Sequence, residues 1–144
     1  MAYKSRFNPK NKSKYMGDPS SIICRSLWER RMCKYLDENR NIIRWGSEEL
    51  SIPYYSPVDK KMHKYYPDFL VEKRNPDGTV ETVMIEVKPK KQTEEPLRGK
   101  KQKRVFIKEC LRYSINQAKW EAAKQVCYKN GWRFIILTED HLLS

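Results

Sequence analysis

Apolar residues recur at helical spacing early in the chain and in strand-like runs after it. From Ile22 to about Asn39 they fall three or four positions apart, which predicts a helix whose start is capped within Asp18–Ser21. The turn Asn75-Pro76-Asp77-Gly78 joins two strands, because Pro fixes φ and Gly accepts a positive φ. The other predicted elements are strands at Glu49–Tyr55, Tyr65–Lys73, Thr79–Lys88 and Trp132–Leu137, and helices at about 102–113 and 116–129, the second ended by Asn130-Gly131. This order predicts an α/β fold, with a mixed sheet flanked by helices.

The size of the chain fits one domain. Its 144 residues are 39% hydrophobic and 12% aromatic, enough for one folded core. We expect a basic N-terminal arm over residues 1–17 and a single domain over 18–144. No apolar run approaches the ~20 residues of a membrane span, and the first residues lack the apolar stretch of a secretion signal, so we expect a soluble protein.

Positive charge is concentrated in two segments. The net charge is +12, and residues 1–17 and 88–108 together account for all of it. Such clusters are typical of a surface that binds a polyanion, although a solvated tail and loop would have the same composition. Nucleic acid is favoured over a membrane, because no apolar face accompanies the charge. The candidate DNA-binding residues are Lys12, Lys14, Lys90, Lys91, Arg98, Lys100, Lys101, Lys103 and Arg104.

The four cysteines, at positions 24, 33, 110 and 127, form no C-x-x-C pair. This spacing disfavours a zinc cluster, and the absence of an export signal disfavours disulfides. We expect free and mostly buried thiols.

Strand geometry places candidate catalytic groups together. Residues two apart share a face of a strand, so Glu86 and Lys88 point to one side while Ile85 and Val87 point toward the core. Asp68 lies across the hairpin and can bring a second carboxylate close to Glu86. Two neighbouring carboxylates repel unless a cation lies between them, and Mg²⁺, or Mn²⁺ in its place, takes such oxygen ligands together with water and phosphate. A nearby lysine can hold the attacking water and offset charge on the phosphate.

The spacing P-D-x17-E-x-K is the PD-(D/E)-x-K nuclease pattern, and its strand-turn-strand context supports that interpretation. An exposed Glu-Lys pair of purely structural value would fit the same residues. Glu29 stands beside Trp28, which should pack inward, so its carboxylate could face the sheet; a solvated Glu paired with Arg25 one turn away fits equally well.

These residues resemble the head-completion nucleases of T-even-type bacteriophages. The resemblance covers nearly the whole chain and rests on Lys14-Tyr15-x-Gly17-Asp18-Pro19, Arg25-Ser26-x-Trp28-Glu29, Trp45-Gly46-Ser47-Glu48, Ile52-Pro53-Tyr54, Pro67-Asp68, Glu86-Val87-Lys88-Pro89-Lys90-Lys91, Tyr113-Ser114-x-Asn116, Lys119-Trp120-x-Ala122-Ala123 and Leu137-Thr138-Glu139-Asp140. The core is also similar to transposon-end endonucleases. The segment 92–104 departs from the family pattern, which puts substrate preference and partner contacts in question more than the chemistry.

The resemblance implies a restriction-endonuclease-like fold and a metal-dependent deoxyribonuclease. It implies that Asp68 and Glu86 hold the metal ion, that Lys88 is the catalytic lysine, that Glu29 completes the acidic site, and that Gln117 supports it. It also implies double-stranded DNA as substrate, phage head or portal-neck proteins as partners, and a place in the virion and in the host cytoplasm during assembly. The alternatives are a head component that binds DNA without cutting it and, with less support, an RNA-binding module, whose typical aromatic strands are missing.

Overall fold

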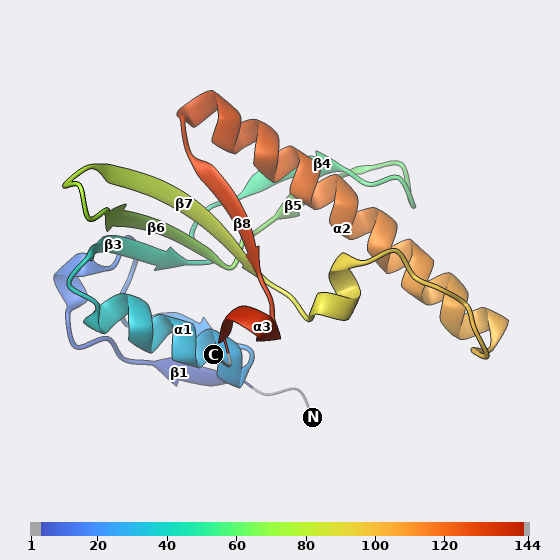
Figure 1. Ribbon diagram of the computed structural model, residues 1–144, viewed down its shortest axis with the longest axis horizontal. Coiled ribbons are helices and arrows are strands. Elements are labelled where there is room, and N and C mark those ends of the chain that lie inside the picture. The colour runs from blue at the N-terminus through green and yellow to red at the C-terminus, as the bar shows by residue number, and fades with distance from the viewer. Residues whose placement is uncertain (1–3, 143–144) are drawn as a thin grey trace.

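Two helices cover the two faces of one mixed β-sheet in the computed structural model, which describes residues 4–142 (Figure 1). In chain order the elements are β1 (Ser5–Phe7), the short 3-10 helix η1 (Lys12–Lys14), β2 (Ile22–Cys24), α1 (Leu27–Glu38), β3 (Ile42–Ser47), β4 (Ile52–Tyr55), β5 (Met62–Tyr65), β6 (Phe69–Arg74), β7 (Val80–Val87), the 3-10 helix η2 (Lys90–Thr93), α2 (Lys103–Asn130), β8 (Arg133–Leu137) and α3 (Glu139–Leu142).

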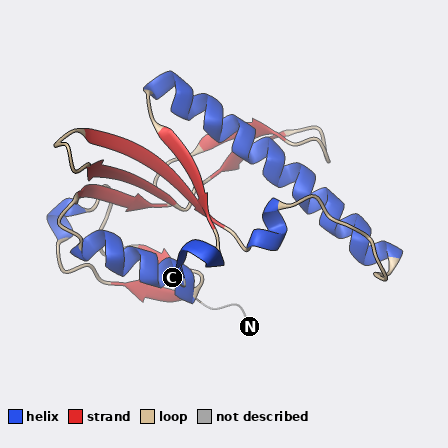
Figure 2. Ribbon diagram, in the orientation of Figure 1, coloured by secondary structure: helices blue, strands red, loops and turns tan. Residues whose placement is uncertain are grey.

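The central sheet has the strand order β3-β6-β7-β8. β6 is antiparallel to both β3 and β7, whereas β8 is parallel to β7. The remaining strands form two separate two-stranded sheets, β1 with β2 and β4 with β5 (Figure 2). This arrangement confirms the predicted α/β fold with a mixed sheet flanked by helices.

Both faces of β7 are buried. Val83 and Ile85 join the apolar cluster that includes Met32 of α1, whereas Met84 joins the cluster that includes Trp120 of α2. The sequence predicted a core only on the Ile85 side. Glu86 is therefore not a surface residue: it alternates onto the α2 face, where it is 4% exposed.

The described part of the N-terminal segment, which we expected to be a basic arm, packs against the rest of the domain. β1 pairs with β2, and Phe7 and Tyr15 make edge-on contacts with the buried Trp45 at 6.0 and 4.7 Å between ring centroids. Ile22–Cys24 is consequently a strand, and the prediction of a helix from Ile22 was wrong there. The helix begins at Leu27, and its N-cap is Ser26, whose hydroxyl accepts from the main-chain N–H of Glu29.

Two further predicted elements differ in their limits. The strand expected over Tyr65–Lys73 is divided at Tyr66-Pro67, because β5 pairs with β4 while β6 belongs to the central sheet. The two helices expected over 102–129 are one continuous α2 of 28 residues, roughly 40 Å long. That helix contains no Gly or Pro to interrupt it, and it ends as predicted at Gly131, which has a φ of 70°.

Cys24, Cys33 and Cys127 are buried free thiols, and the Cys24 and Cys33 Sγ atoms lie 3.6 Å apart. Within residues 4–142, no helix has the length and apolar character needed to cross a membrane.

Candidate active site

Glu86 and Lys88 lie where β7 leaves the central sheet. The Lys88 Nζ is 3.9 Å from Glu86 Oε1, and the Lys88 main-chain N–H donates to the Leu137 carbonyl of β8 at 2.9 Å. The two side chains predicted to share a strand face thus form an ion pair. The pair is partly withdrawn from water, because the Glu86 side chain is 6% exposed and that of Lys88 is 29% exposed.

Asp68 is held against the same strand end. It directly precedes β6, whose first residue Phe69 pairs with Ile85, so Asp68 lies level with the end of β7. Its Oδ2 accepts a hydrogen bond of 2.7 Å from the main-chain N–H of Val87. Burial raises the pKa of the Asp68 carboxyl to about 7, and the carboxylate of Glu29 adds to this effect. The Val87 hydrogen bond and the Lys88 ammonium lower the same pKa without reversing the shift.

Glu86 has a similar environment. Burial raises its pKa to about 7, opposed by the cations Lys88 and Lys119 and increased by Glu29. The Tyr65 hydroxyl of β5 donates a hydrogen bond to Glu86 Oε2. Two carboxyl groups with strongly raised pKa values therefore lie within the influence of the same lysine.

Glu29 joins this cluster from α1. Its Oε2 accepts from the main-chain N–H of Arg25 at 2.7 Å, while the Arg25 guanidinium instead contacts Glu48 at 3.2 Å. Burial raises the Glu29 pKa, with a further contribution from Glu48 and an opposing one from Lys88. Of the two interpretations open from the sequence, the half-buried position near Asp68 and Lys88 fits the first, and no Glu29–Arg25 side-chain ion pair is found among the described residues.

Lys119 of α2 could, from the sequence, either reach the site or be solvated, and we did not predict it as a site residue. Its Nζ lies over the rings of Tyr54 and Tyr65, at 5.8 and 5.7 Å from the centroids. Burial and Lys88 lower its pKa, while Glu86 and Asp68 raise it. Its position along the helix is the feature of the sequence that points to the site, because Lys119 borders the buried face formed by Asn116, Trp120 and Ala123. Gln117, the predicted supporting residue, is exposed on another side of the helix.

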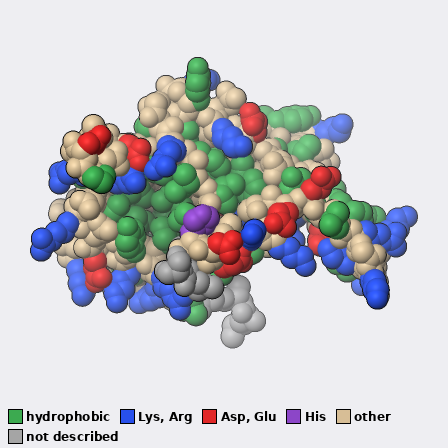
Figure 3. Space-filling view, in the orientation of Figure 1, with side chains coloured by type: hydrophobic (Ala, Val, Ile, Leu, Met, Phe, Trp, Pro, Cys, Tyr) green, Lys and Arg blue, Asp and Glu red, His purple; other side chains and the backbone are tan. Residues whose placement is uncertain are grey.

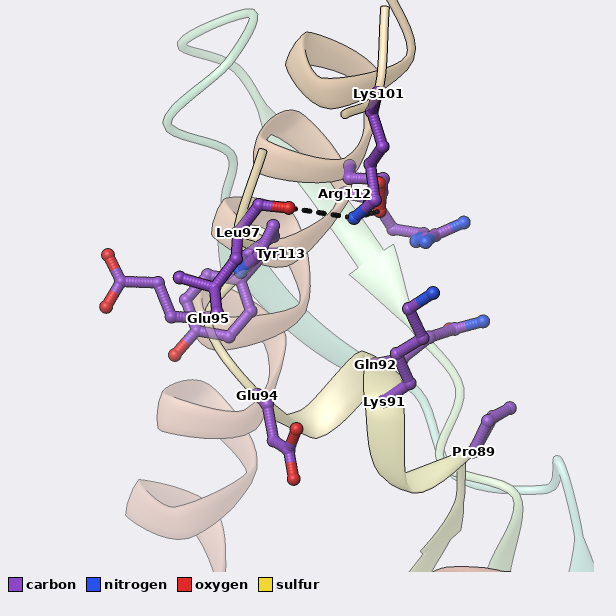
Figure 4. Close-up of a pocket in the computed structure, with 11 residues that line it drawn as sticks. Pro89, Lys91, Gln92, Glu94, Glu95, Leu97, Lys101, Arg112 and Tyr113 are labelled. Atoms are coloured by element: carbon purple, nitrogen blue, oxygen red, sulfur yellow. Dashed lines mark hydrogen bonds and ion pairs between the residues drawn. The ribbon is translucent and has the colours of Figure 1, made fainter. Parts of the chain in front are cut away.

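Four of the nine candidate DNA-binding residues have side chains with intramolecular partners: Lys14, Lys90, Arg98 and Lys101. Lys14 Nζ donates to the carbonyls of Asp37 and Asn39, Lys90 Nζ contacts Asp140 at 3.4 Å, and Lys101 Nζ contacts Glu109 at 2.8 Å. Lys101 and Glu109 are among the residues that line a cavity of about 300 Å³ between the 89–101 segment and α2 (Figure 4).

Arg98 and the five remaining candidate DNA-binding residues are exposed. Arg98 Nε donates to the Lys101 carbonyl, while the side chains at Lys12, Lys91, Lys100, Lys103 and Arg104 lie at the surface. Figure 3 shows Lys and Arg side chains gathered over the end of α2 that extends beyond the sheet. The basic segment after Lys88 thus leads from the carboxylate cluster to a positively charged tip.

Comparison with known proteins identifies the relatives of this chain. Residues 39–139 match the family model described as TnsA-like endonuclease N terminal, which implies a restriction-endonuclease-like core. The chain is also 40% identical over 146 residues to the head completion nuclease of Enterobacteria phage T4, covering 99% of this chain and 95% of that protein. No solved structure matches the chain. The resemblance drawn from the sequence is confirmed.

Proposed function

Because the chain belongs to the TnsA-like endonuclease family, we propose that it is a metal-dependent deoxyribonuclease that hydrolyses phosphodiester bonds of packaged DNA during phage head completion. The observation that supports this function is the convergence of Asp68, Glu86 and Lys88 at one end of β7, with Asp68 bonded to the residue between the other two. A carboxylate pair beside a lysine is suited to phosphate hydrolysis.

The donor set fits Mg²⁺ better than a metal that needs a closed protein cage. Within the described part of the chain, no three His, Cys, Asp or Glu side chains are grouped to hold a metal ion. Mg²⁺ needs fewer, since it binds through one or two carboxylates and completes its shell with water and substrate phosphate. Burial gives Asp68 and Glu86 pKa values of about 7, so a cation shared by the two carboxylates would relieve the cost of burying them ionised. Mn²⁺ would be accepted by the same oxygen ligands.

In this proposal Asp68 and Glu86 would hold Mg²⁺, and the bound ion would supply Lewis-acid stabilisation of the scissile phosphate. Lys88 orients the attacking water and stabilises the charge that develops on the phosphate oxygens. Glu29 completes the acidic site from α1 and is the candidate to accept the proton of that water, since its pKa is raised by burial. The products would be a 5′-phosphate and a 3′-hydroxyl. The exposed basic residues around the 90–104 segment would hold double-stranded DNA through phosphates and without base specificity.

The place of action follows from the relative. The T4 protein is named a head completion nuclease, and on this basis we assign the present chain to the virion head or neck and to the host cytoplasm during assembly. Head or portal-neck proteins would be its protein partners.

The test is cleavage of supercoiled plasmid DNA in Mg²⁺ by the wild type, Glu86→Ala and Lys88→Ala. Matched controls are Glu72→Ala and Lys73→Ala, which remove the same residue types from partly exposed ion pairs on the neighbouring strand β6. We expect loss of at least about a hundredfold in rate for the site variants and little change for the controls. If the site variants cut as well as the wild type, the assignment of the site is wrong.

The main competing function is a DNA-binding head component that keeps the fold without cutting. It predicts tight and strongly salt-dependent DNA binding by the wild type, with no Mg²⁺-dependent turnover. The same plasmid assay decides between the two functions, because only the nuclease converts supercoiled DNA to nicked or linear forms.

A further inference from the structure

The β4–β5 hairpin has one buried face and one exposed face. Ile52 pairs with Tyr65 and Tyr54 pairs with His63, and the three apolar members of this inner face are less than 9% exposed. The other two pairs, Pro53 with Lys64 and Tyr55 with Met62, point outward by strand alternation. Tyr55 and Met62 are 55% and 62% exposed, and Tyr66, just beyond β5, is 49% exposed. Tyr55 and Met62 are cross-strand neighbours, and exposed large apolar side chains that lie side by side indicate a binding surface.

Lysines accompany these exposed side chains. Lys60 and Lys61 lie at the hairpin turn and Lys64 on β5, and all three are exposed. Among residues 4–142, none of their ammonium groups forms an ion pair with a carboxylate. Asp59, the acidic residue of the turn, accepts from His63 Nε2 at 2.6 Å and from the main-chain N–H of Lys61 at 3.1 Å. The outer face therefore combines aromatic rings with positive charges that have no carboxylate partner in contact.

The hairpin leads directly into the candidate active site. Tyr65, on the inner face, donates to Glu86, and Tyr66 is separated from Asp68 by Pro67 alone. Figure 1 shows the hairpin running outward from the end of the central sheet, alongside α2. A strand of DNA with its phosphate at Asp68 and Glu86 would thus meet Tyr66 first and the lysines further out.

We propose that the outer face of the β4–β5 hairpin binds unpaired nucleotides, with Tyr55 and Tyr66 stacking on bases and Lys60, Lys61 and Lys64 contacting phosphates. The substrate class is then duplex DNA with a single-stranded end next to the cleavage position. This inference rests on the proposed nuclease function, which it extends to a substrate preference.

The chemistry of the patch favours nucleic acid over a protein partner. Every base has a stacking surface, so exposed tyrosines bind single strands with little sequence preference, while lysines follow the backbone. Paired bases inside a duplex present no free face to such rings. An apolar protein partner would instead leave three lysines without counter-charges in the interface.

The experiment measures equilibrium binding by fluorescence anisotropy in EDTA, so that no cleavage occurs. The probes are a blunt duplex and the same duplex carrying a ten-nucleotide dT overhang. The wild type is expected to bind the overhang probe at least about tenfold more tightly than the blunt probe. The variant Tyr55→Ala/Tyr66→Ala is expected to lose that preference, whereas Tyr55→Phe/Tyr66→Phe keeps it.

Matched controls separate stacking from general effects. Tyr128→Ala removes another exposed tyrosine, 85% exposed near the end of α2, and should leave both affinities unchanged. Lys60→Ala/Lys61→Ala/Lys64→Ala should weaken overhang binding and reduce its salt dependence. This second variant leaves the tyrosines in place, so it tests the surface even if the tyrosine variant folds poorly, which a thermal melt would reveal.

Three outcomes overturn the proposal. The first is that the wild type binds both probes with equal affinity. The second is that the tyrosine-to-alanine and lysine-to-alanine variants both keep the wild-type affinity for the overhang probe. The third is that the tyrosine-to-alanine variant loses affinity equally for the blunt and the overhang probe. Unchanged DNA affinity would leave the patch as a protein-binding surface. Because binding is measured without metal, failure here is distinct from failure of the nuclease assignment, which the plasmid assay decides.

Discussion

The Asp68 carboxylate accepts a hydrogen bond of 2.7 Å from the main-chain N–H of Val87, the residue that separates Glu86 from Lys88. This bond joins the start of β6 to the end of β7 beyond their last paired residues, Phe69 and Ile85. It therefore fixes the three polar side chains relative to one another through the backbone. The arrangement is held by the sheet and not by a flexible loop.

Replacing Asp68 by Asn is expected to stabilise the protein while abolishing cleavage. The folded carboxyl has a pKa of about 7, above its ordinary value of 3.8, so the folded state holds a proton that the unfolded chain has released. Stability therefore falls as pH rises through the window from 3.8 to about 7. Asn keeps the shape and an oxygen acceptor for Val87 without the buried charge.

We expect Asp68→Asn to raise the free energy of unfolding by about 1–3 kcal/mol near pH 8 in EDTA, and by much less near pH 4. Thermal melts at both pH values measure it. The control is Glu72→Gln, which removes a partly exposed ion pair of 3.9 Å with Arg44 and should change stability little. A lower melting temperature for Asp68→Asn at pH 8 would contradict this account of the site.

Asp37 is expected to hold the N-terminal segment in place. It is 1% exposed, and its two carboxylate oxygens accept from the main-chain N–H groups of Lys10 and Asn11 at 2.8 and 3.2 Å. Asp37→Ala leaves both donors without that acceptor, which should cost about 2–3 kcal/mol in urea unfolding. The neighbouring Glu38→Ala removes only an exposed contact to Lys10 at 3.4 Å and should cost under about 1 kcal/mol. Equal losses in the two variants would rule out this role.

Local chemistry made part of the fold predictable. The turn at Asn75–Gly78 needs a residue that accepts a positive φ, and Gly78 adopts 88° there with its N–H bonded to the Asn75 carbonyl. The end of α2 was predictable for the same reason, because Gly131 adopts a positive φ of 70° there. The proximity of Glu86 and Lys88 was predictable from strand alternation, because that alternation depends on one continuous segment of the chain.

Features that depend on distant segments were not predictable. β3 was missed because a register shift between Ile42 and Arg44 places the buried Ile42 and Trp45 three residues apart, which breaks the two-residue period. Ile22–Cys24 continues the helical spacing of apolar residues, and its partner β1 is three residues long and mostly polar, so the local sequence does not indicate a strand there. Lys119 and Tyr65 gain their positions at Glu86 only through the packing of α2 and β5 around that strand end.

Lys119 is expected to contribute to cleavage and Gln117 is not. The Lys119 ammonium lies over Tyr54 and Tyr65 and acts on both Glu86 and Asp68, whereas Gln117 is exposed. Lys119→Met keeps the apolar stem and removes the charge, so we expect at least about a tenfold fall in the plasmid cleavage rate. Gln117→Ala should cut at the wild-type rate.

The control for Lys119 is Lys124→Met, which removes an exposed lysine from the same helix. Thermal melts of each variant separate lost chemistry from lost folding. Wild-type cleavage by Lys119→Met would exclude the residue from the reaction, and an effect of Gln117→Ala would restore the role that the sequence first suggested.

The basic tip, defined as Lys100, Lys103 and Arg104, is expected to bind duplex DNA through phosphates. These side chains are exposed at and before the start of α2, which extends beyond the sheet. Each phosphate contact releases counterions, so replacing all three by Ala should reduce the slope of log K against log salt by about 2–3 and weaken binding to any sequence equally.

The matched control is Lys34→Ala/Lys124→Ala/Lys129→Ala, which removes the same charge from exposed positions elsewhere. Titration of a labelled blunt duplex at several salt concentrations measures both slopes. An equal change in the two triple variants would show that net charge alone attracts the DNA, and an unchanged slope in the tip variant would place the duplex on another surface.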